Sequence, residues 1–185
     1  MSSVLNPLAF LVLAGALVAP LIQEESVAAE EPGAFSRTTI DVGMVVSDLD
    51  AAAKFYGETL GFSEASGFSV GAEFCSDAGL TDARPLTIRV FALGSGDDAT
   101  KVKLMQRADG DPKQSDNSFI DSQLGLSYLT VFVSNLNDSI KRLAAANVPI
   151  LGKGPVALGA DASSPQLILV RDPDGNLIEL IGPRL

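Results

Sequence analysis

An internal repeat restricts the possible folds of this chain more than any other feature. The stretch DVGMVVSDLDA (41–51) aligns with YLTVFVSNLND (128–138), which lies 87 residues later. Three positions are identical in the two stretches: Val46, Ser47 and Leu49 match Val133, Ser134 and Leu136. A chain that repeats one supersecondary unit is expected to build two similar modules that pack against each other.

Each copy of the repeat predicts a β-strand followed by a helix. The apolar run ends at a Ser-Asx pair, and an Asp or Asn side chain at this position accepts hydrogen bonds from the first free backbone N–H groups of a helix. The predicted helices cover about 49–59 and 137–146. Gly61 and Asn147 are expected to end them, because both residue types tolerate a left-handed backbone conformation.

The ends of the two copies also correspond. TKVKLMQR (100–107) matches NLIELIGP (176–183), with Lys103 opposite Glu179. Between helix and last strand, each copy contains two further stretches with a strand pattern: about 62–69 and 86–93 in the first, and about 150–157 and 165–171 in the second. The first copy is longer than the second, and its extra residues lie within 67–85, where a short helix is expected near 72–79. DPDGN (172–176) is expected to be a hairpin turn.

The predicted fold is therefore α+β, with two βαβββ modules at 37–107 and 125–185 joined by a polar linker at 108–124. Each module offers a mixed four-stranded sheet with a helix on one face. The two remaining faces can meet across a cleft. Whether the modules close on each other within one chain or exchange with a second chain of a homodimer stays open.

Residues 1–36 are expected to lie outside this domain. PLAFLVLAGALVAPLI (7–22) is uncharged and apolar but shorter than the roughly 20 residues that a membrane span needs. Its length suits the apolar region of a secretory signal peptide, and Ala28 and Ala29 supply small residues for cleavage. Export to the periplasm or the exterior is thus the expectation. Because no Lys or Arg precedes Arg37, an uncleaved membrane anchor remains the alternative.

Composition excludes several classes of function. The net charge of −10 repels a phosphate backbone, so nucleic acid is not an expected partner. The chain has no His, which removes the commonest metal ligand and the commonest general base. Its single cysteine, Cys75, cannot form an intrachain disulfide and is interpreted as a small buried residue. The expected partner is a small organic molecule.

Two motifs resemble a known superfamily. VGMVVSDLDAAAKFYGETLGF (42–62) and LILVRDPDGNLIELI (167–181) resemble the opening and closing signatures of vicinal oxygen chelate domains. This superfamily includes glyoxalase I, extradiol dioxygenases, methylmalonyl-CoA epimerase and bleomycin-resistance proteins. The resemblance covers nearly all of 37–185 and implies the glyoxalase/bleomycin-resistance-like fold, but it does not specify an activity.

The resemblance also indicates where a metal would bind. In metal-using members, the first and last strands of each module supply His or Gln, Glu, His and Glu. The matching positions here are Asp41, Lys103, Tyr128 and Glu179, of which Glu179 alone fits that pattern. An ammonium at position 103 opposes a divalent cation electrostatically. The expectation is therefore a degenerate metal site and no cofactor; if a divalent metal binds, Asp41 and Glu179 would hold it.

Strand alternation leads to the same four positions. Asp41, Lys103 and Glu179 each lie between apolar neighbours that should face a helix, so the polar side chains should face the cleft. Tyr128 is equivalent to Asp41 by the repeat. Since buried charges need partners, Lys103 is predicted to pair with Asp41, Glu179 or both. Arg89 lies in the middle of LTIRVFAL and either faces the cleft, to bind an anionic ligand, or faces solvent.

Four functions remain open. The first is a metal-independent protein that binds a small molecule in the cleft. The second is a metal-dependent lyase, isomerase or dioxygenase that uses Asp41 and Glu179, with Mg²⁺ or Mn²⁺ suiting such oxygen ligands. The third is metal-free acid–base chemistry with Lys103 as base and Tyr128 as acid. The fourth is a structural module with a vestigial cleft. The candidates for catalysis are Lys103, Tyr128 and Glu179; the first function is favoured, and an enzyme activity is left undecided.

Overall fold

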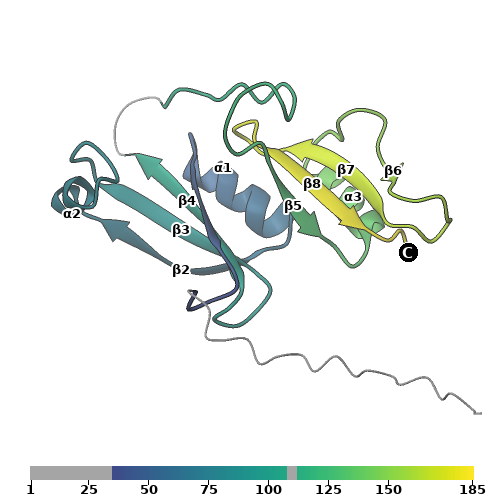
Figure 1. Cartoon of the computed structure of the whole chain (residues 1–185), viewed down its shortest axis with the longest axis horizontal. Helices are drawn as coiled ribbons and strands as arrows, with labels where there is room; N and C mark the ends of the chain where they lie inside the picture. Colours follow the sequence, from purple (N-terminus) through teal and green to yellow (C-terminus); the bar gives the residue numbers. More distant parts are fainter. Residues whose placement is uncertain (1–34, 108–111) are drawn as a thin grey trace, which may run out of the picture. The chain divides into compact units, whose positions relative to one another are not determined.

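A computed structural model describes residues 35–107 and 112–185, and Arg37–Leu185 form one compact unit. The segment interpreted as a signal peptide lies outside the described residues. The elements are β1 (Asp41–Val45), α1 (Leu49–Lys54), η1 (Phe55–Thr59), β2 (Ser63–Val70), α2 (Ala72–Asp77), β3 (Leu86–Leu93), β4 (Thr100–Arg107), β5 (Tyr128–Phe132), α3 (Leu136–Ala145), β6 (Val156–Ala157), β7 (Gln166–Arg171) and β8 (Leu177–Gly182) (Figure 1).

The eight strands of the described residues form two four-stranded sheets with the same topology, which confirms the predicted α+β fold of two repeated modules. Sheet A has the order β1-β4-β3-β2, and sheet B has the order β5-β8-β7-β6. In each sheet the first strand pairs in parallel with the last one, whereas the other pairs are antiparallel. Both sheets are mixed, and β1 and β5 are edge strands.

The helices begin and end where the sequence indicates. Asp48 caps α1 by accepting hydrogen bonds from the backbone N–H groups of Asp50 and Ala51, both at 2.9 Å. Helix α1 continues as the π-helix η1. Asn135 caps α3 in the same way. The chain leaves these helices at Gly61 (φ +91°) and Asn147 (φ +56°), both in left-handed conformations.

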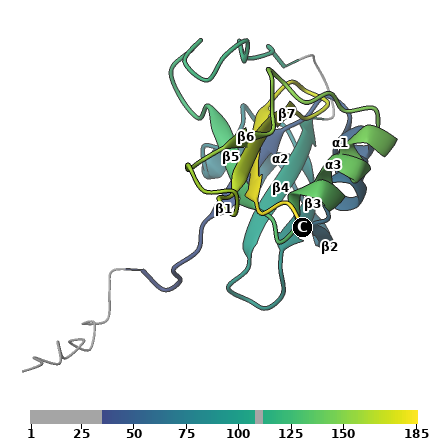
Figure 2. The ribbon, with the colours of Figure 1, turned by 90° about the vertical axis from the view of Figure 1, so that its right-hand side faces the viewer.

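One hydrophobic core joins the two modules. Helices α1 and α3 lie next to each other on one side of the two sheets (Figure 2). The core residues come from both helices and from the helix-facing sides of both sheets, among them Tyr56, Phe91, Leu104, Leu143, Ile168 and Ile178. Each sheet thus buries one apolar face against its own helix, and the helices close the core between modules.

The opposite faces of the two sheets differ. In sheet A, α2 covers a smaller cluster that contains Cys75, Leu86, Ile88 and Val90. Cys75 is fully buried, as expected. No corresponding helix covers sheet B in the described residues. Large apolar side chains on the open face of sheet B, such as Phe132, remain exposed.

The largest departure from the predicted elements is β6. A strand was expected over 150–157, but β6 contains only Val156 and Ala157. Gly152 adopts a left-handed conformation (φ +64°) and Pro155 has no N–H to donate, so the preceding residues cannot continue the ladder. Among residues 35–107 and 112–185, no helix is long and apolar enough to cross a membrane.

Candidate functional site

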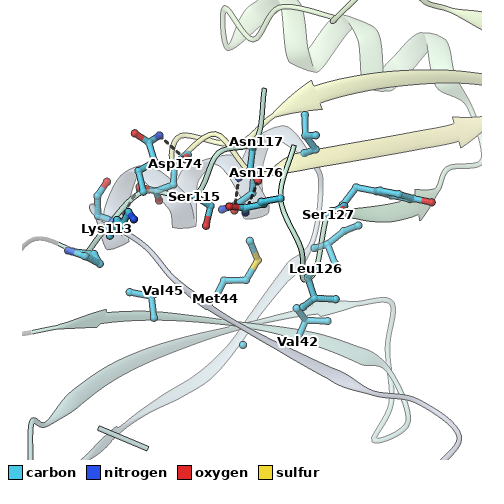
Figure 3. A pocket seen from close by; sticks show the side chains of 18 of the residues that line it. Val42, Met44, Val45, Lys113, Ser115, Asn117, Leu126, Ser127, Asp174 and Asn176 are labelled. Carbon is cyan, nitrogen blue, oxygen red and sulfur yellow. Dashed lines mark hydrogen bonds between the residues drawn. The ribbon is translucent and has the colours of Figure 1, made fainter. Parts of the chain in front are cut away.

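A hollow of about 930 Å³ lies where the two modules and the linker meet (Figure 3). Its first wall is the edge strand β1, from Val42 to Val45. The linker and the start of β5 form a second wall, and the turn between β7 and β8 forms a third. Since β1 pairs with β4 on one side only, its other edge borders the hollow.

The lining of the hollow combines apolar and polar groups. Val42, Met44 and Leu126 present apolar surface. Polar side chains in the lining come from Lys113, Ser47, Ser115, Ser127 and Tyr128. The polar groups of these five side chains make no hydrogen bond within the described part of the chain. An apolar floor with a few free polar groups is typical of a small-molecule site.

A buried hydrogen bond beneath the hollow joins the modules. The Tyr56 hydroxyl on η1 donates to Asp172 Oδ2 at 3.0 Å, in the turn between β7 and β8. Tyr56 is fully buried and Asp172 is 5% exposed. The hydroxyl also lies 3.3 Å from the sulfur of Met44, a residue of the lining. The position of this turn relative to β1 therefore depends on a contact between residues far apart in sequence.

Four donors surround the Asp172 carboxylate. Besides the Tyr56 hydroxyl, these are the backbone N–H groups of Asp174 and Asn176 and the side-chain amide of Asn176. Burial nevertheless raises the pKa of Asp172 above its ordinary value, while the hydrogen bonds oppose this shift. Burial, with the nearby Asp172 carboxylate, also raises the pKa of Tyr56, which therefore stays protonated and acts as a donor.

An amide chain connects the linker to this carboxylate. Gln123 donates to Asn117 Oδ1 at 3.3 Å, and Asn117 donates to Asn176 Oδ1 at 3.4 Å. Arg171 also donates to the backbone carbonyl oxygens of Asn117 and Ser118. The linker wall of the hollow is thus fixed to the second module.

Asp174 makes a second connection between modules. Its Oδ1 accepts the Ser47 backbone N–H at 3.1 Å, directly after β1, and its carbonyl oxygen accepts from Gln114. Its Oδ2 is buried and has no hydrogen-bond partner among residues 35–107 and 112–185. DPDGN (172–176) is a turn, as predicted, but its two aspartates also join the modules.

The predicted pairing of Lys103 with Asp41 is confirmed. The Lys103 Nζ lies 2.8 Å from Asp41 Oδ2, and Arg37 lies 3.7 Å from the same oxygen. The hydrogen bond from Lys103 holds the pKa of Asp41 below its ordinary value. The Asp41 side chain is 16% exposed and the Lys103 side chain is 34% exposed, so this pair is partly shielded from solvent.

The other predicted residues do not join this pair. Glu179 accepts a hydrogen bond from Thr130 Oγ1 at 2.7 Å, and no ion pair links it to Lys103 in the described residues. Tyr128 lines the hollow, whereas Asp41, Lys103 and Glu179 are not among the described lining residues. Asp41 and Lys103 therefore share one face of sheet A, and Tyr128 and Glu179 share one face of sheet B.

Arg89 lies on the opposite face of sheet A from Lys103. The register pairs Arg89 with Leu104 and Val90 with Lys103. Arg89 therefore points to the helix side, where it binds both oxygens of Glu64 at 2.6 and 2.8 Å and Asp50 at 2.9 Å. The bonds from Arg89 lower the pKa of Glu64.

The two carboxylates at the family's metal positions, Asp41 and Glu179, already have partners in the described residues. Asp41 is already bonded to an ammonium group, and Glu179 is bonded to a hydroxyl. Residues 35–107 and 112–185 contain no group of three or more His, Cys, Asp or Glu side chains placed to hold a metal. A cation here would have to displace Lys103 from its carboxylate.

The comparison of sequences identifies the family. The model of the Glyoxalase/Bleomycin resistance protein/Dioxygenase superfamily matches residues 39–180. The chain belongs to this superfamily. No curated protein matches the chain. The match includes both modules, so it confirms the resemblance to vicinal oxygen chelate domains that the two sequence motifs indicated.

Solved structures of other proteins have the same fold, and three of them cover most of this chain. A glyoxalase family protein from Bacillus cereus is 19% identical, with a TM-score of 0.65 over 83% of this chain and 98% of that protein. The trypanothione-dependent glyoxalase I of Leishmania major is 21% identical, with a TM-score of 0.55 over 80% and 87%. A domain from Frankia sp. is 19% identical, with a TM-score of 0.51 over 80% and 90%. At these identities, the likeness shows the fold.

Sequence reasoning missed the residues beneath the hollow. Tyr56 reads as an ordinary core residue, and Asp172 reads as a turn residue. Their contact spans 116 positions of sequence, so no local pattern reports it. The available signal was the aromatic hydroxyl itself, since a buried Tyr needs a hydrogen-bond partner.

Proposed function

We propose that this protein binds a small organic molecule without a metal, in the hollow between its two modules. The observation that carries the proposal is the hollow itself, about 930 Å³, to which both modules and the linker contribute. Small-molecule sites commonly occupy about 300–1,000 Å³. Tyr128, Ser115 and Lys113 would orient the ligand, and Met44 and Val42 would contact its apolar part.

Independence from metal is supported by the Asp41–Lys103 pair. Position 103, which corresponds to a metal ligand, carries an ammonium group 2.8 Å from the Asp41 carboxylate. A divalent ion there would face repulsion from Lys103 and would have to break the ion pair. The same pair argues against the metal-dependent alternative that uses Asp41 and Glu179.

The proposal is tested by a thermal-shift screen of small molecules on untagged protein, with and without EDTA, and by elemental analysis. Ser115→Trp places a large ring in the linker wall of the hollow. Ser163→Trp is the matched control, because Ser163 is exposed on a loop outside the lining. Hits should stabilise the wild type and Ser163→Trp but not Ser115→Trp, and EDTA should change nothing.

Two results contradict the proposal. One is a stoichiometric divalent ion in the purified protein. The other is a set of hits that stabilise Ser115→Trp as strongly as the wild type, which would place binding elsewhere. A screen without any hit would instead favour the structural-module alternative.

Export of the protein is a separate proposal, supported by the uncharged apolar stretch at 7–22 and the small residues that follow it. Expression of the full chain followed by cell fractionation and N-terminal sequencing tests it. A mature N-terminus near Ala29 in the exported fraction is expected. Full-length protein in the membrane fraction would instead identify an uncleaved anchor.

A further inference from the structure

We propose that sheet A carries a second binding site, for a small anion that also bears a hydroxyl group, such as a protonated phosphate. The site lies on the face of β1 and β4 that holds Asp41, Lys101 and Lys103, with Arg37 beside it. This site is separate from the hollow and goes beyond the function proposed above.

The register of two neighbouring strands brings these side chains together. Asp41 pairs with Lys101, and Gly43 pairs with Lys103, in the parallel β1–β4 ladder. Paired residues of a ladder point to the same face, and residues two apart on a strand do so as well. Lys101 and Lys103 therefore flank Asp41 on one surface. Arg37 reaches the same carboxylate from the chain before β1.

The local charge is opposite to that of the whole protein. The charged groups that lower the pKa of Asp41 are three cations: Lys103, Arg37 and Lys101. One carboxylate therefore faces three positive charges, although the net charge of the chain is −10. Lys101 lies opposite Asp41 in the ladder but forms no ion pair within the described residues. A local positive excess of this kind attracts an anion.

Two buried oxygen atoms at the site, Thr39 Oγ1 and Asp41 Oδ1, make no hydrogen bond within the described residues. Thr39 precedes Asp41 by two positions, so in an extended chain its side chain points to the same face. Buried polar atoms without partners are uncommon and need an explanation, such as an absent ligand. These two atoms need different partners, since a hydroxyl can donate and a carboxylate can accept.

A hydroxylated anion satisfies both atoms. Its charged oxygens would bind Lys101 and Arg37 and accept from the Thr39 hydroxyl, while its own hydroxyl would donate to Asp41 Oδ1. Because both free oxygens are buried, the ligand must displace a covering side chain. Arg37 is suited to move, because its side chain is 43% exposed and lies 3.7 Å from Asp41 Oδ2, longer than a close hydrogen bond.

The anion's hydroxyl provides the discriminating test. Phosphate and sulfate have nearly the same size and shape, but at about pH 6 phosphate carries protons and sulfate carries none. Isothermal titration of the full chain with each sodium salt, at constant ionic strength, should show phosphate binding more tightly than sulfate. Asp41→Asn should remove this preference, because an amide can donate to sulfate.

Variants of the cations test the rest of the site. Lys101→Gln and Arg37→Gln should each weaken phosphate binding about tenfold, since each removes a charge-assisted hydrogen bond. Lys141→Gln is the matched control, because Lys141 is 77% exposed on α3 and pairs with Asp138. Both test variants alter partly exposed side chains, so folding should be retained.

The proposal is overturned if phosphate gives no saturable binding, if sulfate binds the wild type as tightly, or if Lys101→Gln behaves like Lys141→Gln. Ser115→Trp separates this site from the hollow. Phosphate should still bind that variant, so failure of either proposal leaves the other to stand on its own measurements.

Discussion

Replacing Tyr56 by Phe tests the contact that joins the modules beneath the hollow. The substitution removes one hydroxyl and keeps the ring, which packs edge-on against Phe55 and Phe62 with centroid distances of 5.3 and 6.0 Å. Asp172 Oδ2 would then keep Asn176 Nδ2 as its donor and lose the other. The free energy of unfolding should therefore fall by the contribution of one hydrogen bond to a buried carboxylate.

The magnitude follows from the burial of both partners. A hydrogen bond to a charged group contributes about 1.5–3 kcal/mol, so unfolding free energy should fall by about 2 kcal/mol. For a domain of this size, each kcal/mol shifts the Tm by about 2–4 °C. Tyr56→Phe should therefore lower the Tm by about 4–8 °C. Tyr128→Phe is the control: Tyr128 is 45% exposed and should change stability by less than about 0.5 kcal/mol.

The pH dependence separates the hydrogen bond from simple packing. The Tyr56 hydroxyl lowers the pKa of Asp172, against the larger effect of burial. Its removal should raise that pKa further, which makes the ionised form more costly in the variant. The difference between variant and wild type should therefore be large near pH 7 and shrink as the pH falls to 3.8, the ordinary pKa of Asp, because a carboxyl group whose pKa is raised gains its proton above that value.

The assay is urea unfolding followed by circular dichroism at both pH values. A loss below about 0.5 kcal/mol near neutral pH would refute the assigned contribution of this bond. An equal loss at both pH values would refute the role of the ionised carboxylate.

Three further predictions concern single positions. Asn147→Ala should lower stability by about 1–2 kcal/mol because Asn147 adopts φ +56°, whereas Asn147→Gly should be nearly neutral; chemical denaturation compares them. Gly182→Ala should lose more than about 2 kcal/mol, because a Cβ at Gly182 would overlap the carbonyl oxygen of Val133, and equal stability of the variant would contradict that contact. The pKa of Asp41 is lowered in the folded protein, so its ionised carboxylate stabilises the fold at pH values above 3.8, the ordinary pKa of Asp, and this stability is lost as the pH falls through the lower folded-state pKa. Asp41→Asn should therefore flatten acid unfolding curves. Unchanged curves would count against the Asp41–Lys103 pair.

Local signals predicted the fold where local chemistry decides it. The side chains of Asp48 and Asn135 begin the helices, and the strands at 86–93 and 100–107 have the predicted bounds. The 150–157 strand failed because Gly152 and Pro155 interrupt the ladder. An apolar pattern alone therefore predicts too long a strand when a Gly or a Pro within it prevents ladder hydrogen bonds.

The site was predictable only in part, because it depends on register and on distant contacts. The Asp41–Lys103 pair followed from alternation on two adjacent strands. The direction of Arg89 was left open because it depends on the β3–β4 pairing, where a shift of one residue exchanges the two faces. The Tyr56–Asp172 hydrogen bond joins the two modules, and no periodic pattern in the sequence predicts it.

The core shared by α1, α3 and both sheets has a consequence for how the repeat unfolds. Tyr56 and Leu104 of the first module and Leu143 and Ile178 of the second belong to the same cluster. Cutting the chain at the linker would expose this apolar surface on both halves, so neither half is expected to be stable in isolation. We therefore expect the two copies of the repeat to unfold as one cooperative unit and not as two independent domains.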